Sequence, residues 1–599
     1  MANRKLTDYI PVNGCKRITT YMAGVIRENW RGCVLFLLMC VNLLYMHNVV
    51  LTDDMQDTDR YIRKPFAFAC FDVLLTLLFF SLLTWRRKKL TYILSYAFLV
   101  FFVLSNVIYS RFFHTYFSPG VFSEISNFKG TWWFGYVQDA FKWTDLLLVF
   151  TTALFALCLR NKVWRMARMN VMSLLILLLM ICVGQIWYDV KDGYVKDFVS
   201  CYDRYLGSYF QNEYRYNSEP SVVSCGIIRT QVVCDILIGT GHKALDDAEK
   251  KEIDLYLAKM KKERDAQYAG TTVAGCPNIV FIIVESYLSV VSDLKVNGKE
   301  VTPYLNAIKH QGAYYNGRVT PCITTGESSD AQVMYFAGMI PLSKDMAIMS
   351  VIRDDIIGLP RLLHEQKGYS TYMTIPTTLS FWHQEEANMK YGIDTTYSTM
   401  QYGGDTWAND SIIFSVALDR QKQMKEPFFH AILTLSMHAT YKEDRFPELE
   451  ELVFPDHYST EYKNYLKCCH YTDMQIGRYI EEMKTKGKYD NTVFIIASDH
   501  EAHVECLCTP VEELNDLKIP IYIINAGIDT YKAYAGDILQ IDLYPSLMDL
   551  FGIKSDFSGM GHSIFRQNYK CELTDEARNI SGRILTGNYF GQKMRSADK

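Results

Sequence analysis

Five apolar stretches within the first third of the chain constrain its fold more than any other feature. Most of them are close to the roughly twenty residues that a membrane-spanning helix needs. They cover residues 33–51, 66–85, 91–110, 145–159 and 171–188. The fourth stretch is short and the second contains Asp72, so a count of four spans stays open beside a count of five. The sequence therefore predicts an α-helical transmembrane domain of about five helices over residues 1–190.

Lys and Arg are unevenly distributed among the segments that join these stretches. With five spans and a cytoplasmic amino terminus, the inner segments contain Arg86-Arg-Lys-Lys89 and four basic residues between 160 and 168. The outer segments contain fewer basic residues and include four aspartates between 53 and 59. Because positive charge collects on the cytoplasmic side, everything after Tyr188 is expected outside the cytoplasm.

The remaining chain changes character at about residue 276. Residues 191–275 are polar and contain a dense run of Lys and Glu from 246 to 264, which favours a helical connector that lifts the next domain off the bilayer. From 276 to 599, strand-like and helix-like patterns alternate, which predicts one α/β domain with a mostly parallel central sheet. Expected strands include residues 369–375, 428–436 and 519–525, and the clearest helix covers residues 462–486.

Two further apolar runs in this domain end in acidic or imidazole groups. Residues 278–284 precede Glu285, and residues 492–498 precede Asp499 and His500. Runs of Val, Ile and Phe without alternation suit strands that are buried on both faces. Ligands collect at the carboxyl ends of such strands, so these three side chains are expected to share one crevice as a metal site. The alternative is a pair of core strands whose polar ends only meet water.

A third segment, Gly326-Glu-Ser-Ser-Asp330, supplies a candidate nucleophile at the start of a predicted helix. Ser328 has two possible roles there: it caps the helix, or it attacks phosphorus while helix N–H groups hold the phosphate oxygens. A serine hydroxyl is a poor nucleophile near neutral pH unless a base or a metal assists it. A divalent ion bound to the three side chains and to the serine oxygen would supply that assistance.

Together these segments resemble the alkaline phosphatase and sulfatase superfamily. The resemblance is to its membrane branch, which contains lipoteichoic acid synthases and phosphoethanolamine transferases. Its motifs match Asn278 to Glu285, Gly326 to Gln332, Leu435-Ser-Met-His438, Asp499-His500 and Ile541-Asp-Leu-Tyr-Pro545. The resemblance implies a sulfatase-like fold, a metal bound by Glu285, Ser328, Asp499 and His500, and a phosphate contact from His438. It also implies a bacterial cell membrane location with the catalytic domain on the extracytoplasmic or periplasmic side.

Other positions near these motifs are candidates for substrate binding. Trp382 is either a wall for the headgroup or a core tryptophan, and His383 stands where the synthases have asparagine. His503 either binds phosphate or a second ion, or is an exposed loop histidine.

The chain also departs from the lipoteichoic acid synthase pattern. Ser328 replaces threonine, Glu327 replaces lysine, and Gln384 stands where those synthases use an arginine to grip glycerol phosphate. Cys322 lacks the downstream residues that true sulfatases need for their modified cofactor residue, so sulfate ester hydrolysis is not expected. The departures leave the transferred group open between phosphoglycerol and phosphoethanolamine.

The resemblance implies a transferase that moves such a headgroup from a membrane phospholipid to an extracytoplasmic glycan or lipid acceptor through phosphoserine. A phosphodiesterase or phosphatase that uses water is the alternative enzyme, and a membrane-anchored binding protein with a degenerate site is the alternative outside enzymes. One imidazole with oxygen ligands is compatible with Mn²⁺ or Zn²⁺ and less suited to Mg²⁺. The net charge is -4 and there is no basic stripe, so no nucleic-acid partner is expected.

Overall fold

The structure is a computed structural model of the chain, which divides into two compact units. Helices α1 to α8 belong to the first unit, and all elements from α12 onward belong to the second. The structure describes residues 12–50, 64–84, 88–113, 141–160, 171–191, 195–205, 245–266, 273–311, 313–324, 326–342, 346–402, 409–449, 452–509, 514, 517–528, 533–567 and 569–597.

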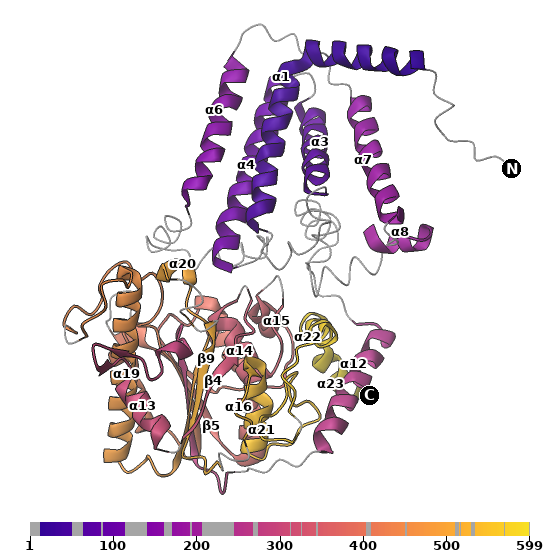
Figure 1. Cartoon of the computed structure of the whole chain (residues 1–599). Helices are drawn as coiled ribbons and strands as arrows, with labels where there is room; N and C mark the ends of the chain where they lie inside the picture. The colour runs from indigo at the N-terminus through magenta and orange to yellow at the C-terminus, as the bar shows by residue number, and fades with distance from the viewer. Residues whose placement is uncertain are drawn as a thin grey trace, which may run out of the picture. The chain divides into compact units, whose positions relative to one another are not determined.

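The first unit is a bundle of apolar helices (Figure 1). Its helices are α1 Val12–Val50, α3 Lys64–Thr84, α4 Lys88–Phe113, α6 Leu146–Arg160, α7 Val171–Lys191 and α8 Phe198–Tyr205. Four apolar segments are long enough to cross a membrane, namely Gly32–Val50, Phe66–Thr84, Lys89–Arg111 and Leu174–Lys191. A fifth, Trp143–Leu159, is apolar but shorter. The prediction of four to five membrane helices is confirmed, and the chain is a multi-pass membrane protein.

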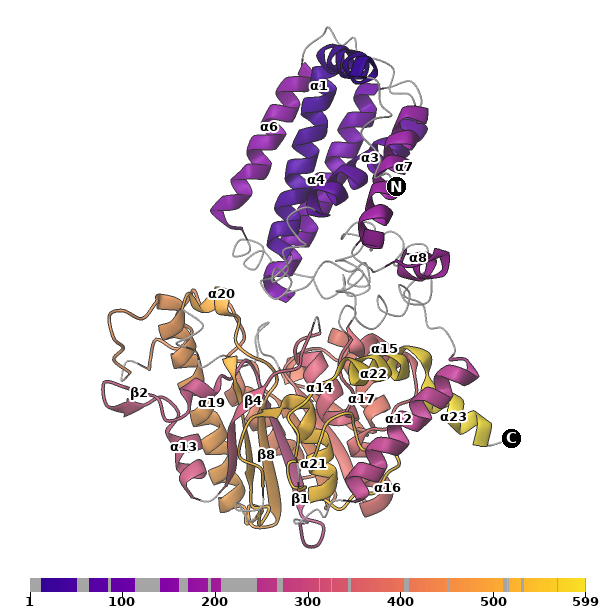
Figure 2. The same ribbon diagram turned by 45° about the vertical axis from the view of Figure 1, so that its right-hand side comes forward.

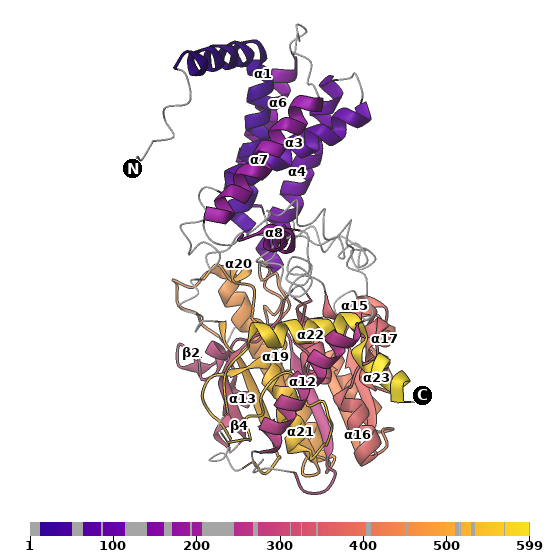
Figure 3. The ribbon, with the colours of Figure 1, turned by 90° about the vertical axis from the view of Figure 1, so that its right-hand side faces the viewer.

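Helix α6 lies beside α1 (Figure 3), and polar side chains connect it to the longer helices. Thr151 on α6 donates a hydrogen bond to Asn42 Oδ1 on α1 at 2.7 Å, and Asn42 Nδ2 donates to Tyr96 OH on α4 at 3.2 Å. Just before α6, Asp145 pairs with Arg111 of α4 at 2.7 Å. Interhelical hydrogen bonds of this kind join helices in an apolar environment. These contacts join α6 to the longer helices, and its crossing of the membrane stays a prediction.

An eight-stranded sheet forms the centre of the second unit. Its order is β10-β4-β9-β8-β1-β7-β5-β6, and β9 alone runs antiparallel to both of its neighbours. The strands are β1 Asn278–Val284, β4 Tyr314–Thr320, β5 Ser370–Ile375, β6 Thr395–Ser398, β7 Phe428–Leu433, β8 Thr492–Ser498, β9 Ile519–Ile524 and β10 Ile538–Leu539. The predicted mostly parallel α/β sheet is confirmed.

Helices cover both faces of this sheet (Figures 1 and 2). Ile279, Phe281 and Ile283 of β1 pack into a core with α14 Ser328–Ala337, α15 Ala347–Arg353, α16 Leu359–Lys367, α17 Gln384–Tyr391, α21 Leu543–Leu550 and α22 Asp575–Gly587. Val280, Ile282 and Val284 pack into the opposite core with α13 Pro303–His310, α18 Asp410–Gln421 and α19 Thr460–Thr485. The predicted helix at 462–486 is therefore confirmed as α19. Burial of β1 on both faces explains its unbroken apolar sequence.

The charged segment that follows residue 245 packs on the second unit. Helix α12 Asp247–Asp265 buries Ile253 in the core beside α22, and Glu252 pairs with Arg583 at 2.5 Å. Asp254 accepts a hydrogen bond from Tyr589 at the start of α23 Tyr589–Ala597. The predicted domain boundaries at 190 and 275 stay predictions.

The remaining elements are short helical turns and two small strands. They are η3 Trp143–Asp145, η5 Ser289–Val291, β2 Lys295–Val296, β3 Lys299–Glu300, η6 Phe381–His383, η7 Thr399–Tyr402, α20 Val504–Leu507 and η9 Gln540–Asp542.

Strand β7 ends three residues earlier than the sequence predicts, and the cause lies on α18. The carboxylate of Asp410 accepts hydrogen bonds from the backbone N–H groups of Leu435 at 2.8 Å and Ser436 at 3.0 Å. Thr434 N–H still donates to the carbonyl oxygen of Ile283 in β1. After Thr434, the contacts with Asp410 turn the chain away from the sheet. The chain turns here, because His438 N–H donates to the carbonyl oxygen of Leu435 at 3.0 Å.

Candidate active site

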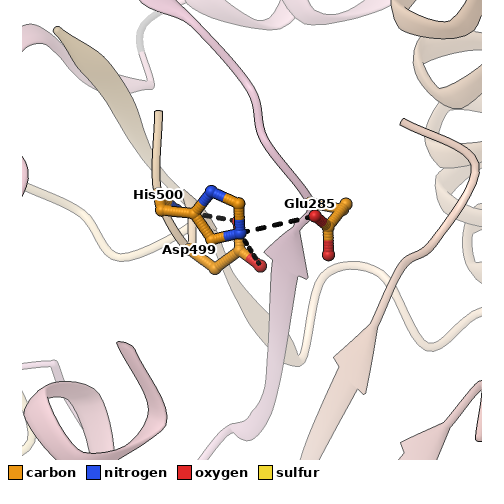
Figure 4. Close-up of side chains that lie close together, drawn as sticks. All are labelled: Glu285, Asp499 and His500. Carbon is orange, nitrogen blue, oxygen red and sulfur yellow. Dashed lines mark hydrogen bonds and ion pairs between the residues drawn. The ribbon is translucent and has the colours of Figure 1, made fainter. Parts of the chain in front are cut away.

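Two neighbouring parallel strands bring the predicted metal ligands together. In the register of β1 and β8, Val284 lies opposite Ser498, and Asp499 N–H donates to the carbonyl oxygen of Val284 at 3.0 Å. Glu285 and Asp499 therefore follow the two strands at the same level of the sheet. Figure 4 shows Glu285 at the end of β1 with Asp499 and His500 facing it.

The three side chains are buried and close enough to share one ion. One candidate ligand atom from each lies within 4.8 Å of the other two. Nε2 of His500 is 3.4 Å from Oε1 of Glu285 and 3.6 Å from Oδ2 of Asp499. This arrangement confirms that the side chains converge, whereas their role as ligands remains a proposal.

Hydrogen bonds orient each of these groups. Nδ1 of His500 lies 2.8 Å from the carbonyl oxygen of Glu501, which can only accept, so Nδ1 carries the proton. In the neutral ring, Nε2 then offers its lone pair toward the carboxylates. Oδ1 of Asp499 accepts from the backbone N–H groups of Ser286 and His500, each at 2.8 Å.

The polar atoms and charges of the site fit a divalent cation. Oδ2 of Asp499 is buried and accepts no hydrogen bond within the described residues. Burial, reinforced by the nearby Glu285, raises the pKa of Asp499 to about 7. Burial also opposes a charged His500, but Asp499 and Glu285 outweigh it and raise the pKa of the imidazole. A bound cation would satisfy the open oxygen and replace the proton that these groups otherwise share.

Ser328 lies beside the same three side chains. It is the first residue of α14, and its hydroxyl oxygen is 3.3 Å from Nε2 of His500 and 3.5 Å from Oε2 of Glu285. The neighbouring Ser329 hydroxyl is engaged elsewhere, because it donates to the carbonyl oxygen of Gly326 at 2.7 Å.

The turn before α14 is held tightly. Oδ2 of Asp330 accepts hydrogen bonds from the N–H groups of Thr324 at 2.9 Å and Gly326 at 3.0 Å. A Cβ atom on Gly326 would lie 2.2 Å from Oδ1 of Asp330, so no side chain fits at this position. Glu327 adopts a φ of 44°, a left-handed conformation that non-glycine residues rarely take. The turn therefore fixes where Ser328 begins the helix.

Two of the predicted substrate-binding histidines lie near this cluster. Nε2 of His503 is 3.5 Å from Oε1 of Glu327, and its ring centroid is 5.8 Å from that of His500. Nδ1 of His438 is 2.7 Å from the carbonyl oxygen of Ala439, so it donates this proton. Burial opposes ionisation of Glu285, but His438 and then His500 outweigh this effect and lower the pKa of that carboxyl. His438 thus lies close enough to influence the charge of the site.

Trp382 and His383 occupy η6, beyond the end of β5. The Trp382 ring packs edge-on against Phe381 with centroids 5.8 Å apart, and Nδ1 of His383 lies 2.8 Å from Oε2 of Glu386. Their link to α14 runs through the next residue, Gln384, whose Nε2 donates to Gln332 Oε1 at 2.7 Å. The substrate role of both residues remains a proposal.

Sequence reasoning missed several residues that position the site. Gln540 donates to the carbonyl oxygen of Asp499 at 2.5 Å, although the quoted motif began one residue later at Ile541. Thr434 accepts a hydrogen bond from the N–H of Glu285 at 3.0 Å. The guanidinium of Arg445 donates to the carbonyl oxygens of Ser436, His438 and Thr440, and so braces the His438 turn.

Comparison with known proteins places this architecture in a family. The sulfatase family model matches residues 277–553, which contain all eight strands of the central sheet and every candidate site residue. Lipoteichoic acid synthase 2 of Bacillus subtilis (strain 168) is 24% identical over 527 residues, which cover 82% of this chain and 76% of that protein. Residues 277–553 form a sulfatase-superfamily domain, and the chain is similar to lipoteichoic acid synthases over most of its length.

The relationship extends beyond the sulfatase domain. Lipoteichoic acid synthase of Staphylococcus aureus (strain USA300) is 25% identical over 538 residues, which cover 82% of this chain and 78% of the relative. Alignments of this length exceed the whole of Thr240–Lys599 and therefore include residues of the helical unit. The crystal structure of the lipoteichoic acid synthase LtaP from Listeria monocytogenes covers 55% of this chain and 97% of its own, with 20% identity and a TM-score of 0.45.

Proposed function

We propose that this enzyme transfers a phosphorylated headgroup, phosphoglycerol or phosphoethanolamine, from a membrane phospholipid to an extracytoplasmic glycan or lipid acceptor. The observation that carries the proposal is the position of the Ser328 hydroxyl, 3.3 Å from His500 and 3.5 Å from Glu285 at the first residue of α14. The relatives are lipoteichoic acid synthases, which supports headgroup transfer over other reactions of the superfamily.

In the first half-reaction, the Ser328 oxygen loses its proton and forms a bond to the phosphorus of the donor lipid. The bond from phosphorus to the glycerol oxygen of the lipid breaks, and that oxygen takes up a proton and leaves as diacylglycerol. In the second half-reaction, the acceptor hydroxyl loses its proton and its oxygen bonds to the phosphorus of the phosphoserine. The bond from phosphorus to the Ser328 oxygen breaks, and that oxygen takes up a proton to restore the serine hydroxyl. Both halves are displacements at one phosphorus, so a single site serves both.

A divalent cation held by Glu285, Asp499, His500 and Ser328 would lower the pKa of the serine hydroxyl and neutralise charge on the phosphoryl group. His500, which donates Nδ1–H to Glu501, presents Nε2 to this position. The positive end of the α14 helix dipole favours phosphate oxygens there. His438, whose loop is fixed by Asp410 and Arg445, would contact the phosphoryl group.

Membrane attachment suits such a reaction, because the donor lipid need only present its headgroup at the bilayer surface. The bias of Lys and Arg places residues after Tyr188 outside the cytoplasm, where a glycan or lipid acceptor of the cell envelope is available. The second candidate is a phosphodiesterase that uses water in the second step, since the first half-reaction is the same in both.

The test uses the full chain in liposomes that contain phosphatidylglycerol and phosphatidylethanolamine, each with a distinct isotopic label. With Mn²⁺ or Zn²⁺ present, diacylglycerol should form from one of the two lipids, and a chelator should stop it. Addition of acceptor should move the label to the acceptor in a transferase and leave it as free headgroup phosphate in a phosphodiesterase. Absence of diacylglycerol with either lipid and either metal would contradict the proposal.

A further inference from the structure

A pocket opens at the carboxyl ends of β5 and β6. Its volume is about 460 Å³, which lies within the range of about 300–1,000 Å³ typical of small-molecule sites. The pocket is lined by Thr378, Leu379, Ser380, Glu385, Glu386, Ser398 and Met400. These residues come from the loop after β5, the start of α17 and the end of β6.

The pocket lies along the same edge of the sheet as the candidate active site. Strands β1, β7, β5 and β6 are consecutive and parallel, so the residues that follow them lie on one edge. Neighbouring strands are about 4.8 Å apart, which puts the ends of β5 and β6 roughly 10 and 14 Å from the end of β1. Glu285 follows β1, so the same distances separate these strand ends from the start of the candidate metal site.

A buried amide pair ties the pocket to the nucleophile helix. Gln384, which precedes the pocket residues Glu385 and Glu386, exchanges two hydrogen bonds with Gln332 of α14, at 2.7 and 3.2 Å. Gln332 lies one helical turn after Ser328. Helix α14 therefore carries Ser328 and also contacts the pocket wall, through Gln332.

The lining chemistry favours an uncharged sugar over an anionic chain. Glu385 and Glu386 contribute carboxylates, Thr378 and Ser380 contribute hydroxyls, and none of the lining residues is basic. Carboxylates accept hydrogen bonds from sugar hydroxyls but repel phosphate. An imidazole beside them, that of His383, lies 2.8 Å from Glu386, and Lys390 of α17 pairs with Asp355 at 3.6 Å. Leu379 and Met400 offer apolar surface for the C–H face of a ring.

We propose that this pocket is the acceptor subsite and binds an uncharged glycosyl residue, whose free hydroxyl then reaches the phosphoserine at Ser328. This inference rests on the proposed transferase function. The inference also accounts for a departure in the sequence. Gln384 replaces the arginine with which lipoteichoic acid synthases grip glycerol phosphate, and in this chain Gln384 joins the pocket to α14.

The test separates the acceptor step from phosphoserine formation in the full chain. The acceptor probes are the uncharged disaccharides maltose, cellobiose and chitobiose, compared with glycerol 3-phosphate. In the Glu385→Gln, Glu386→Gln double variant, the disaccharide loses its hydrogen bonds to two charged carboxylates. The KM for the preferred disaccharide should therefore rise by about tenfold or more. The substitutions should affect transfer to the disaccharide and leave diacylglycerol release unchanged. The matched control is Glu365→Gln, which removes one exposed carboxylate of α16 outside the pocket and should behave as the wild type.

Charge reversal provides the second arm. Glu385→Lys should reduce transfer to the disaccharide and increase transfer to glycerol 3-phosphate. An unchanged acceptor KM in the double variant, or a wild-type preference for glycerol 3-phosphate, would overturn the subsite proposal while headgroup transfer stands. If the wild type releases no diacylglycerol, the proposed function itself fails, and the two failures are thus distinguished.

Discussion

The hydroxyl oxygen of Ser328 lies 3.3 Å from Nε2 of His500, although the two residues are 172 positions apart in the chain. Ser329, the adjacent serine, instead donates its hydroxyl hydrogen to Gly326. Two neighbouring hydroxyls therefore occupy different environments, one beside the buried acidic and imidazole groups and one within the backbone turn. We therefore propose a reactive role for Ser328 and a structural role for Ser329.

Replacement of the two serines should have opposite outcomes. Ser328→Ala should abolish both the phosphoenzyme and headgroup transfer, and Ser328→Thr, which keeps a hydroxyl, should retain part of each. Ser329→Ala should retain much of the activity but lower the melting temperature, because it removes the hydrogen bond to Gly326. Phosphopeptide mapping of trapped enzyme checks the assignment. A phosphorylated Ser329 or Thr325 would show that the register is wrong.

Metal content should depend on residues that lie on separate strands. Alanine at Glu285, Asp499 or His500 should lower metal affinity by more than about 100-fold and abolish activity, while circular dichroism remains that of the folded protein. Elemental analysis of the purified chain measures this. The matched control is Asp490→Ala, an exposed carboxylate at the opposite end of β8. Full metal occupancy in the Asp499→Ala protein would remove the assignment.

The convergence of Glu285, Asp499 and His500 was predictable from the sequence, because these residues directly follow two predicted strands. Apolar runs before Glu285 and before Asp499 and His500 indicate buried parallel strands, and their carboxyl ends must share one edge of the sheet. The proposal of Ser328 as the nucleophile needed the family register as well, since a serine at a helix start is also a common cap.

The supporting contacts were not predictable in the same way. Gln540 and Arg445 act through backbone carbonyls that are close only after the chain has folded. The early end of β7 likewise depends on Asp410, which lies on another element and diverts the strand through two backbone N–H groups. A local sequence pattern carries no information about such partners, whereas strand and helix periodicity depends on neighbouring residues alone.

Arg445 should position His438 without touching substrate. Arg445→Gln removes the donors to the carbonyl oxygens of Ser436, His438 and Thr440, so kcat should fall by about tenfold while metal content is unchanged. A double-mutant cycle checks that the effect runs through the histidine, because Arg445→Gln should add little loss in the His438→Ala background. Additive losses from the two substitutions would contradict this role.

Topology can be tested on intact cells. The bias of Lys and Arg predicts that protease added outside, or to spheroplasts where an outer membrane is present, cleaves the chain after Tyr188. The basic segment at 160–170 should remain intact until the membrane is opened, and it serves as the internal control. Cleavage of that segment together with protection of the sulfatase domain would show the opposite orientation. That outcome is expected if α6 does not cross the membrane.

The most direct test of headgroup transfer is the intact mass of the protein after a single turnover. The full chain is incubated with mixed phosphatidylglycerol and phosphatidylethanolamine, with metal and without acceptor, and then quenched in acid and digested. We predict a mass increase equal to one phosphoglycerol or one phosphoethanolamine group, located on Ser328 and absent from the Ser328→Ala protein. Diacylglycerol release without any covalent adduct on Ser328 would contradict the phosphoserine mechanism.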